Sequence, residues 1–360
     1  MKKKILFIVP HFLNGGAEKN LIRVINNLSE EAYDISILCL QHLGNNADLL
    51  RKGIKIIDID TPSIYLSIFK IARVIKQIKP DVIFCWMGYL NAYMAFFIPF
   101  FRKKFKWFCR ESNIPTLVNT QFKFPWLFDF FYKKLNRYDK IIAQSAVMSK
   151  DLQVNFGVLP GKIIIINNSI DFKENEKNKT CVLEKEPGKF YLLFVGGLRI
   201  EKRAHILIDA LALLPENYML VIVGSGDELE KVTIAIHSQH LQKRVEIISD
   251  CYNPVPYYQR ADCLLLSSAF EGFPNVVIEA FACGCPAIGY NIAGGANEAL
   301  DNYGGFSLQD KSVQDFADNI IWVCESARLD REKIIRNCKD KYDINRVIPI
   351  YDSIFSEPNH

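Results

Sequence analysis

The chain has 360 residues, of which 49% are hydrophobic and 23% are charged, the values of a globular protein with large cores rather than of a disordered one. This length favours two domains. The net charge of +4 is unevenly divided: residues 1–171 carry 24 Lys and Arg against 13 Asp and Glu, whereas the remainder carries 20 against 27. The basic first half is therefore expected to meet an anionic partner.

The ten cysteines show no spacing typical of a disulfide framework. Cys39, Cys85 and Cys263 fall within apolar runs, so we expect buried thiols in a reducing cytosol. The only close pair, Cys283 and Cys285, lacks a second pair or a nearby histidine, and no metal site is predicted there.

The first ten residues mimic a signal peptide, with three lysines before an apolar run. That run is short and ends at Pro10 without a cleavage site of small residues, so a first strand is predicted instead. The longest apolar stretch, residues 89–101, is too short to span a bilayer.

Strand and helix patterns alternate along the first half, which predicts a parallel sheet with right-handed crossovers. Short apolar runs mark the strands, and longer patterned segments mark the helices. Strands are predicted at residues 5–9, 35–40, 54–59, 82–85 and 141–143, and helices at 16–28, 64–78 and 125–135.

Residues 173–189 are rich in Lys, Glu and Asn and nearly devoid of apolar side chains, which predicts a linker. A second alternating series follows it. Strands are predicted at residues 190–195, 219–223, 245–248, 263–266 and 286–289, and helices at 204–214, 228–237, 276–282 and 345–355.

Two glutamates, Glu271 and Glu279, bracket the start of one predicted helix. Glu271 follows a buried strand, at the edge where open α/β sheets bind ligands. Pro274 suits the first helical position, because its missing N–H would have no partner there. Two carboxylates beside a helix N-terminus suit a ligand that carries both hydroxyls and phosphate, such as a nucleotide sugar.

Several sequence motifs occur in the order in which a known enzyme family has them. They are Gly15-Gly16-Ala17-Glu18, Asn168 to Asp171, Phe194 to Lys202, Asn253 to Asp262, Glu271 to Ala280, Gly284 to Pro286, and Gly294 to Glu298. Together they resemble the retaining glycosyltransferases of family 4, and the resemblance covers nearly the whole chain. It implies the α/β fold called GT-B, in which two Rossmann-like, doubly wound domains face a cleft.

The resemblance implies four segments. Residues 1–172 would form an acceptor-side domain, 173–189 a linker, 190–342 the domain that binds the nucleotide sugar, and 343–360 a helix that packs back on the first domain.

In these enzymes the polar groups of the segment that corresponds to Glu271–Ala280 bind the donor. Glu279 resembles the residue that holds the ribose, since one carboxylate can accept from two vicinal hydroxyls. Glu271 resembles the contact to hydroxyls of the transferred sugar. The N–H of Phe273 resembles a donor to a sugar hydroxyl, and those of Asn275 and Val276 resemble donors to the diphosphate. Each glutamate also has an alternative, structural role. Glu279 could be a solvated residue on the helix surface, and Glu271 could be an acidic residue in the first helical turn, where the helix dipole favours it.

Lys202 resembles the catalytic cation that neutralises the leaving diphosphate. The chain departs from the family at Gly197, where members often carry arginine. Arg199 is a candidate for the missing charge, although strand alternation could equally point it elsewhere. The alternative for Lys202 is a surface lysine.

In the first half, Gly15 and Gly16 allow a tight turn before a helix, and their N–H groups can approach a phosphate or the acceptor. A plain strand-to-helix turn is the alternative. Many members place a histidine against the sugar in a middle region of this domain. Here that region offers Arg110, Glu111 and Asn113 instead as sugar or acceptor candidates, with a cap or salt bridge as the alternative role.

No metal and no cofactor are expected. Asp58 and Asp60 spell the metal-binding pattern of another glycosyltransferase fold, but alternate strand residues face apart and no supporting ligand lies near them in the sequence. Lys202 and helix N-termini can take the place of a cation in the GT-B fold.

Aromatic and basic residues interleave in two stretches of the first half, residues 97–108 and 122–137. This mixture suits an anionic membrane surface, whereas the alternative is core aromatics with solvated lysines. Nucleic acid is not expected as a partner.

The sequence therefore predicts a retaining, metal-independent glycosyltransferase. It would move a hexose or N-acetylhexosamine from a nucleoside diphosphate, with uridine as the expected base, to a glycan or a polyprenyl-diphosphate-linked acceptor. The enzyme is expected to act at the inner face of the cytoplasmic membrane. Two alternatives stay open at this point: a nucleotide-sugar epimerase of the same fold, and a non-catalytic subunit that binds a nucleotide sugar.

Overall fold

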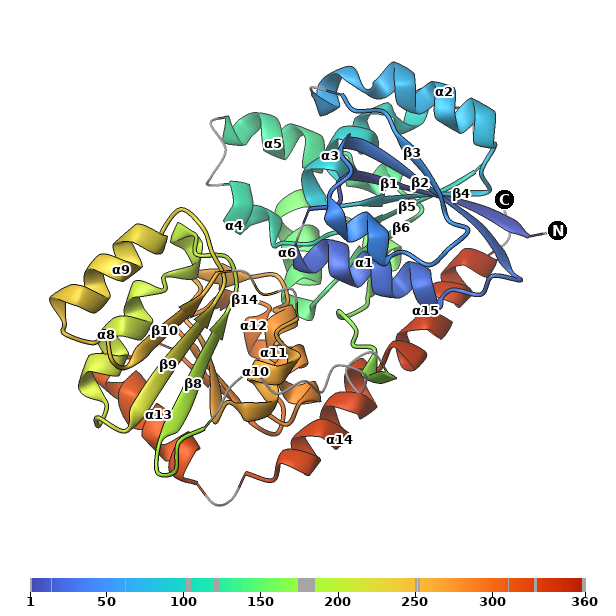
Figure 1. Cartoon of the computed structure of the whole chain (residues 1–360). Coiled ribbons are helices and arrows are strands. Elements are labelled where there is room, and N and C mark those ends of the chain that lie inside the picture. The colour runs from blue at the N-terminus through green and yellow to red at the C-terminus, as the bar shows by residue number, and fades with distance from the viewer. Residues whose placement is uncertain are drawn as a thin grey trace. The chain divides into compact units, whose positions relative to one another are not determined.

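A computed structural model gives the fold (Figure 1). It describes residues 2–13, 15–61, 63–101, 105–119, 124–173, 185–249, 251, 253–309, 311–326 and 329–357. The chain divides into two compact units: the first is Met1–Ser169 with Ile344–His360, and the second is Ile170–Asp343. Most of the predicted linker lies outside the described residues.

The first unit is built on a parallel sheet with the strand order β3-β2-β1-β4-β5-β6-β7. Its central strands are apolar runs because helices bury them on both faces. The order reverses between β1 and β4, and such a switch point is where open sheets bind ligands. The strands are β1 (Lys3–His11), β2 (Tyr33–His42), β3 (Lys55–Asp58), β4 (Val82–Trp86), β5 (Lys106–Arg110), β6 (Lys140–Ala143) and β7 (Ile163–Ile165).

Helices cover both faces of this sheet. One layer is α2 (Ile68–Ile78), α3 (Gly88–Phe97), α5 (Pro125–Tyr132) and α6 (Ala146–Phe156), whose apolar sides share one core. The opposite layer is α1 (Gly16–Asn27) and α15 (Ile344–Ser356), two helices far apart in the sequence that lie side by side (Figure 1). Shorter elements are α4 (Pro115–Asn119), η1 (Asn45–Leu49), η2 (Ile64–Leu66), η3 (Ile98–Phe100), η4 (Leu135–Arg137) and η5 (Pro160–Lys162).

The second unit repeats the plan with a parallel sheet in the order β10-β9-β8-β11-β13-β15. Its strands are β8 (Phe190–Val195), β9 (Tyr218–Val223), β10 (Val245–Ile248), β11 (Cys263–Leu266), β13 (Ala287–Tyr290) and β15 (Gly305–Leu308). A separate short pair, β12 (Phe270–Glu271) and β14 (Ala293–Gly294), lies beyond the ends of β11 and β13.

Two helical layers bury this second sheet. One comprises α10 (Val255–Arg260), α11 (Asn275–Ala282), α12 (Ala296–Leu300) and α14 (Arg331–Tyr342). The other comprises α8 (His205–Leu213), α9 (Leu229–Ser238) and α13 (Val313–Glu325). The turn η6 (Ile200–Lys202) follows β8 and leads into α8.

The predicted α/β alternation is confirmed in both units, and Cys39, Cys85 and Cys263 are buried free thiols as expected. Pro274 is the residue before α11 rather than its first residue, because its backbone is extended. Several elements were not predicted, among them β5, β7, β15, α3, α6, α10, α12, α13 and α14. Strand β5 was treated as part of a basic–aromatic stretch, and α3 was considered only as a membrane span. Within the described residues, no helix is long and apolar enough to cross a bilayer.

Candidate active site

Lys202 and Glu271 form the centre of the site in the second unit. The Nζ atom of Lys202 lies 2.5 Å from Oε1 of Glu271, and both side chains are largely but not fully buried. Ser268 Oγ donates to the same carboxylate oxygen at 2.7 Å. Two residues that lie 69 positions apart in the sequence thus share one ion pair at the carboxyl end of the sheet.

A glycine-rich loop after β8 places Lys202. Gly196, Gly224 and Gly226 all have positive φ angles, between 149° and 154°. A Cβ atom on Gly224 would clash with the carbonyl oxygen of Gly196, so only glycine allows these two loops to touch. Leu198 N–H donates to Ser225 O at 2.8 Å and ties the loops together.

Arg203 joins this loop to the segment after β11. It has a φ angle of 47°, and its guanidinium donates to the carbonyl oxygens of Ser267 at 2.6 Å and Ser268 at 2.9 Å. Ser267 Oγ in turn donates to Lys202 O at 2.8 Å. Desolvation lowers the pKa of Arg203, although the group remains a cation because its ordinary pKa is so high. Sequence reasoning missed this residue, since only its partners reveal its role.

Glu279 lies on α11, half-buried, one turn after Asn275. The hydroxyl of Tyr258 on α10 donates to its Oε2 at 3.2 Å. Tyr258 has no exposed surface, and burial followed by the charge of Glu279 raises its pKa well above the usual value. The phenol therefore stays protonated and acts as a donor to Glu279.

The N-terminus of α11 lies between the two glutamates in the sequence. Pro274 precedes the helix and has no N–H to donate, while Asn275 and Val276 form its first turn and are half-buried. The N–H groups of a first turn point out of the helix and favour anions. Phe273 is buried, with its ring 5.7 Å from that of Tyr342.

Arg199 is exposed and pairs with Glu201, whose Oε1 lies 3.0 Å from its Nε. That same Nε lies 3.4 Å from the place where a Cβ of Gly197 would be. A guanidinium thus lies beside the position at which the family often has arginine. Its contact with a phosphate stays a prediction.

Two family models cover the chain in succession. Glycosyltransferase Family 4 matches residues 14–174, and Glycosyl transferases group 1 matches residues 175–341. The chain belongs to glycosyltransferase family 4.

Relatives of this glycosyltransferase include two enzymes named for lipid-linked substrates. One is the N-acetylgalactosamine-N,N'-diacetylbacillosaminyl-diphospho-undecaprenol 4-alpha-N-acetylgalactosaminyltransferase of Campylobacter jejuni, 28% identical over 80% of this chain and 77% of the relative. The other is the UDP-Gal:alpha-D-GlcNAc-diphosphoundecaprenol alpha-1,3-galactosyltransferase of Escherichia coli, 24% identical over 94% of this chain and 92% of that enzyme.

Solved structures show the same fold at low sequence identity. Anabaena Alr3699/HepE in complex with UDP matches with a TM-score of 0.82 at 20% identity, over 99% of this chain and 100% of that one. The lipopolysaccharide outer core galactosyltransferase WaaB matches with a TM-score of 0.73 at 22% identity, over 98% and 99% of the two chains. The glycosyltransferase therefore has the GT-B fold, as predicted.

The first unit of the glycosyltransferase places Gly15 immediately before α1, with Gly16 as its first residue. A Cβ on Gly15 would clash with the carboxylate of the buried Glu18. Oε1 of Glu18 also lies 3.0 Å from Nδ1 of His11, at the end of β1. A side chain at position 15 would therefore displace this carboxylate.

Arg110, at the end of β5, is fully buried. Its guanidinium donates to Asn168 Oδ1 at 2.7 Å and to Tyr351 Oη at 3.1 Å, and it lies 5.1 Å from the centre of the Trp86 ring. These contacts favour the structural role that the sequence left open. Among the three candidates from this region, Asn113 alone is exposed, and its contact with an acceptor stays a prediction.

Glu111 is also fully buried. Its carboxylate accepts from Asn91 Nδ2 at 2.7 Å and from Tyr132 Oη at 3.2 Å. Burial raises its pKa from 4.5 to about 7, against the lowering effect of these two hydrogen bonds and with a smaller rise from the charge of Asp151. Because Asn91 lies on α3 and Tyr132 on α5, Glu111 joins two helices of one layer.

Replacing Glu111 with glutamine should change how stability depends on pH. The folded state holds the Glu111 proton more tightly than the unfolded chain, so the stability from this group is complete below pH 4.5 and is lost as pH rises through about 7. From pH 5 to 8 the wild type should lose about 2 to 3 kcal/mol more unfolding free energy than Glu111→Gln. Urea denaturation at each pH measures this. The exposed Glu31→Gln is the control, and parallel curves for all three proteins would contradict the assignment.

The described residues contain no group of three or more His, Cys, Asp or Glu side chains that could hold a metal ion. Asp58 Oδ1 instead accepts the N–H of Asp60 at 2.9 Å, within a turn where Asp60 has a φ angle of 33°. Cys283 and Cys285 are close in the sequence. Burial raises the pKa of both thiols to about 12, which disfavours the thiolate form that binds metal ions.

Proposed function

We propose that this glycosyltransferase moves a hexose or N-acetylhexosamine from a uridine diphosphate to a growing glycan on a polyprenyl diphosphate. The donor sugar would keep its anomeric configuration. The observation that carries the proposal is the ion pair between Lys202, in the turn after β8, and Glu271, in the segment that leads into α11, with Glu279 one turn into that helix. The names of the C. jejuni and E. coli relatives support a lipid-linked acceptor, and the UDP complex of HepE supports the nucleotide.

Each side chain has one task in this proposal. Glu279 accepts hydrogen bonds from the ribose hydroxyls, and the first turn of α11 donates to the diphosphate. Glu271 accepts from hydroxyls of the transferred sugar. Lys202 neutralises the negative charge that grows on the diphosphate as the bond to the sugar breaks.

The transfer itself needs no separate base. The bond from the acceptor oxygen to C1 of the sugar forms on the face from which the phosphate oxygen leaves, and that phosphate oxygen takes the acceptor proton. Lys202 and the α11 N-terminus supply the positive field that a metal ion provides in other enzymes. We therefore propose that the reaction is independent of metal ions.

An assay with labelled nucleotide sugars tests the activity. We expect release of UDP only when a polyprenyl-diphosphate-linked saccharide is present, with the label appearing in the lipid fraction and with EDTA having no effect. Conversion of one nucleotide sugar to another without acceptor would identify an epimerase. Binding of UDP without turnover on any donor and acceptor would identify a binding subunit.

A lipid-linked acceptor places the enzyme at a membrane, and the first unit has a surface that suits one. Helix α5 has the sequence Pro-Trp-Leu-Phe-Asp-Phe-Phe-Tyr, which is apolar nearly all round. Phe128 and Tyr132 are buried, while Trp126 on the other side is 67% exposed and Phe130 is 45% exposed. A helix with aromatic residues on its outer side is costly in water unless a lipid or protein surface covers it.

Cations surround these aromatic residues. Lys134 Nζ lies 4.8 Å from the centre of the Phe130 ring, and Arg137 binds the carbonyl oxygen of Phe96 at 2.8 Å, next to the exposed Phe100. Residues 64–137 carry 13 Lys and Arg against 3 Asp and Glu, a net charge of +10, compared with +11 for residues 1–171 as a whole. We propose that this layer docks on an anionic bilayer, on the inner face of the cytoplasmic membrane.

Helix α2 extends the same layer with a basic face. Lys70, Arg73 and Lys76 are exposed at intervals of three residues, and the helix contains no acidic residue. Its inner side, with Val74 and Ile75, packs into the core shared with α5. Each cation near an anionic membrane contributes about 1 kcal/mol, so these cations add appreciably to reversible attachment.

Flotation with lipid vesicles tests this surface. Wild-type protein should float with vesicles rich in phosphatidylglycerol and should do so less at high salt. Trp126→Ser combined with Phe130→Ser should remove most of the floated protein. Trp322→Ser, an exposed tryptophan of the second unit, is the matched control and should float like the wild type. No flotation of the wild type, or equal flotation of all variants, would refute the docking surface.

A further inference from the structure

The side chain of Tyr258 is fully buried, and its hydroxyl donates a hydrogen bond to Glu279. A glutamate side chain has several rotatable bonds, and holding it in one conformation costs entropy. A buried phenol that fixes one carboxylate oxygen reduces this cost before any ligand arrives.

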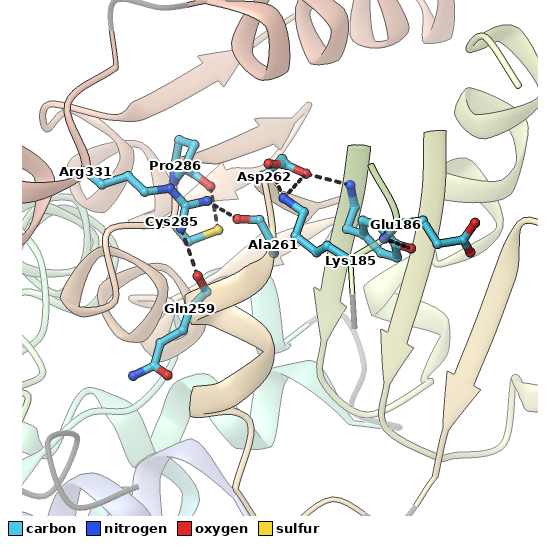
Figure 2. A network of polar contacts seen from close by, with 9 residues as sticks. Lys185, Glu186, Gln259, Ala261, Asp262, Cys285, Pro286 and Arg331 are labelled. Carbon is cyan, nitrogen blue, oxygen red and sulfur yellow. Dashed lines mark hydrogen bonds and ion pairs between the residues drawn. The ribbon is translucent and has the colours of Figure 1, made fainter. Parts of the chain in front are cut away.

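Helix α10, which carries Tyr258, is itself fixed at its C-terminal end. Arg331 at the start of α14 donates through Nη1 to Gln259 O at 2.9 Å and through Nη2 to Ala261 O. Figure 2 shows its guanidinium between these carbonyl groups, close to Cys285 and Pro286 in the loop after α11. One side chain thus anchors the last turn of α10 from a third helix.

The next residue along the chain, Asp262, is also held in place. Its backbone N–H donates to Tyr191 O, and its carboxylate accepts the Tyr191 N–H, each at 2.8 Å. Lys185 Nζ binds the two carboxylate oxygens at 2.7 and 2.8 Å (Figure 2). The end of α10 is therefore tied to β8 on one side and to α14 on the other, so the position of the Tyr258 hydroxyl is set by the whole unit.

We propose that Tyr258 is a positioning residue that holds Glu279 ready for the ribose of the nucleotide. This inference rests on the proposed function of Glu279. Tyr258 touches no substrate in this role; it acts only through the carboxylate. The hydroxyl is expected to matter for nucleotide affinity and little for the chemical step, because the ribose is bound in the ground state and the transition state alike.

Tyr258→Phe tests the proposal, because it removes one oxygen atom and keeps the packing. We expect UDP to bind about five- to tenfold more weakly by calorimetry, the range of one net hydrogen bond, with a matching rise in KM for the donor and an almost unchanged kcat. Tyr257→Phe is the matched control, since Tyr257 is a buried neighbour on the same helix. Thermal melts of both variants report any loss of folding.

A double-mutant cycle separates positioning from packing. In a Glu279→Gln background, Tyr258→Phe should add little to the loss of UDP affinity. Equal UDP affinity of Tyr258→Phe and Tyr257→Phe would overturn the inference, and so would full additivity with Glu279→Gln. If the wild type itself fails to bind UDP, the proposed function falls and takes this inference with it.

Discussion

Replacing Lys202 with alanine is expected to lower the rate of sugar transfer by about a hundred- to a thousandfold, as when one preorganised group is removed from a developing anion. The reason is local: Lys202 pairs with Glu271 and is held in place through Ser267 and Arg203. A lysine fixed in this way needs little rearrangement when charge appears on the leaving phosphate. Measurement of kcat with saturating donor gives the effect.

Lys231→Ala is the control for this prediction, because Lys231 forms an exposed pair with Glu228 on the surface of the same unit. It should transfer sugar at the wild-type rate. A Lys202→Ala enzyme that retained more than about a tenth of the wild-type kcat would contradict the assigned role, since a loss that small is below what an electrostatic group at the reacting bond supplies.

Glu271→Ala separates the two members of the pair. The carboxylate that binds Lys202 would be absent, so the lysine would be more available to the diphosphate, and UDP should bind as well as or better than in the wild type. Turnover should fall, because the sugar hydroxyls lose their acceptor. Calorimetry and kcat on the same preparation distinguish the effects. A parallel loss of both would show that Glu271 mainly maintains the loop.

The alternation of strands and helices was visible in the sequence because buried parallel strands are short apolar runs. Strand β5 was missed for a physical reason: Lys106 and Arg110 are its first and last residues, and the buried Trp107 belongs to the basic–aromatic stretch that suggested a membrane surface. Helix α3 was missed because it is apolar on nearly all sides and shows no helical periodicity.

Lys202, Glu271 and Glu279 were each singled out in the sequence, but their contacts were not predicted. The pairing of Lys202 with Glu271 joins distant segments, and Arg203 ties these segments together through the carbonyl oxygens of Ser267 and Ser268. Tyr258 is one of two adjacent tyrosines, and nothing in the sequence says which of them faces Glu279. Arg110 was a sugar or acceptor candidate because it stands where many family members have a histidine, and the sequence could not show that its polar partners allow it to be fully buried.

Replacing Glu279 with alanine is expected to weaken UDP binding by about ten- to a hundredfold, because two charge-assisted hydrogen bonds to the ribose would be lost. The kcat at saturating donor should change far less, since the ribose is remote from the bond that breaks. Calorimetry with UDP and with UDP lacking the ribose hydroxyls measures this, and the variant should no longer distinguish the two ligands. Glu230→Ala, an exposed acid on α9, is the control. If Glu279→Ala bound UDP as the wild type does, the carboxylate on α11 would not be the ribose ligand.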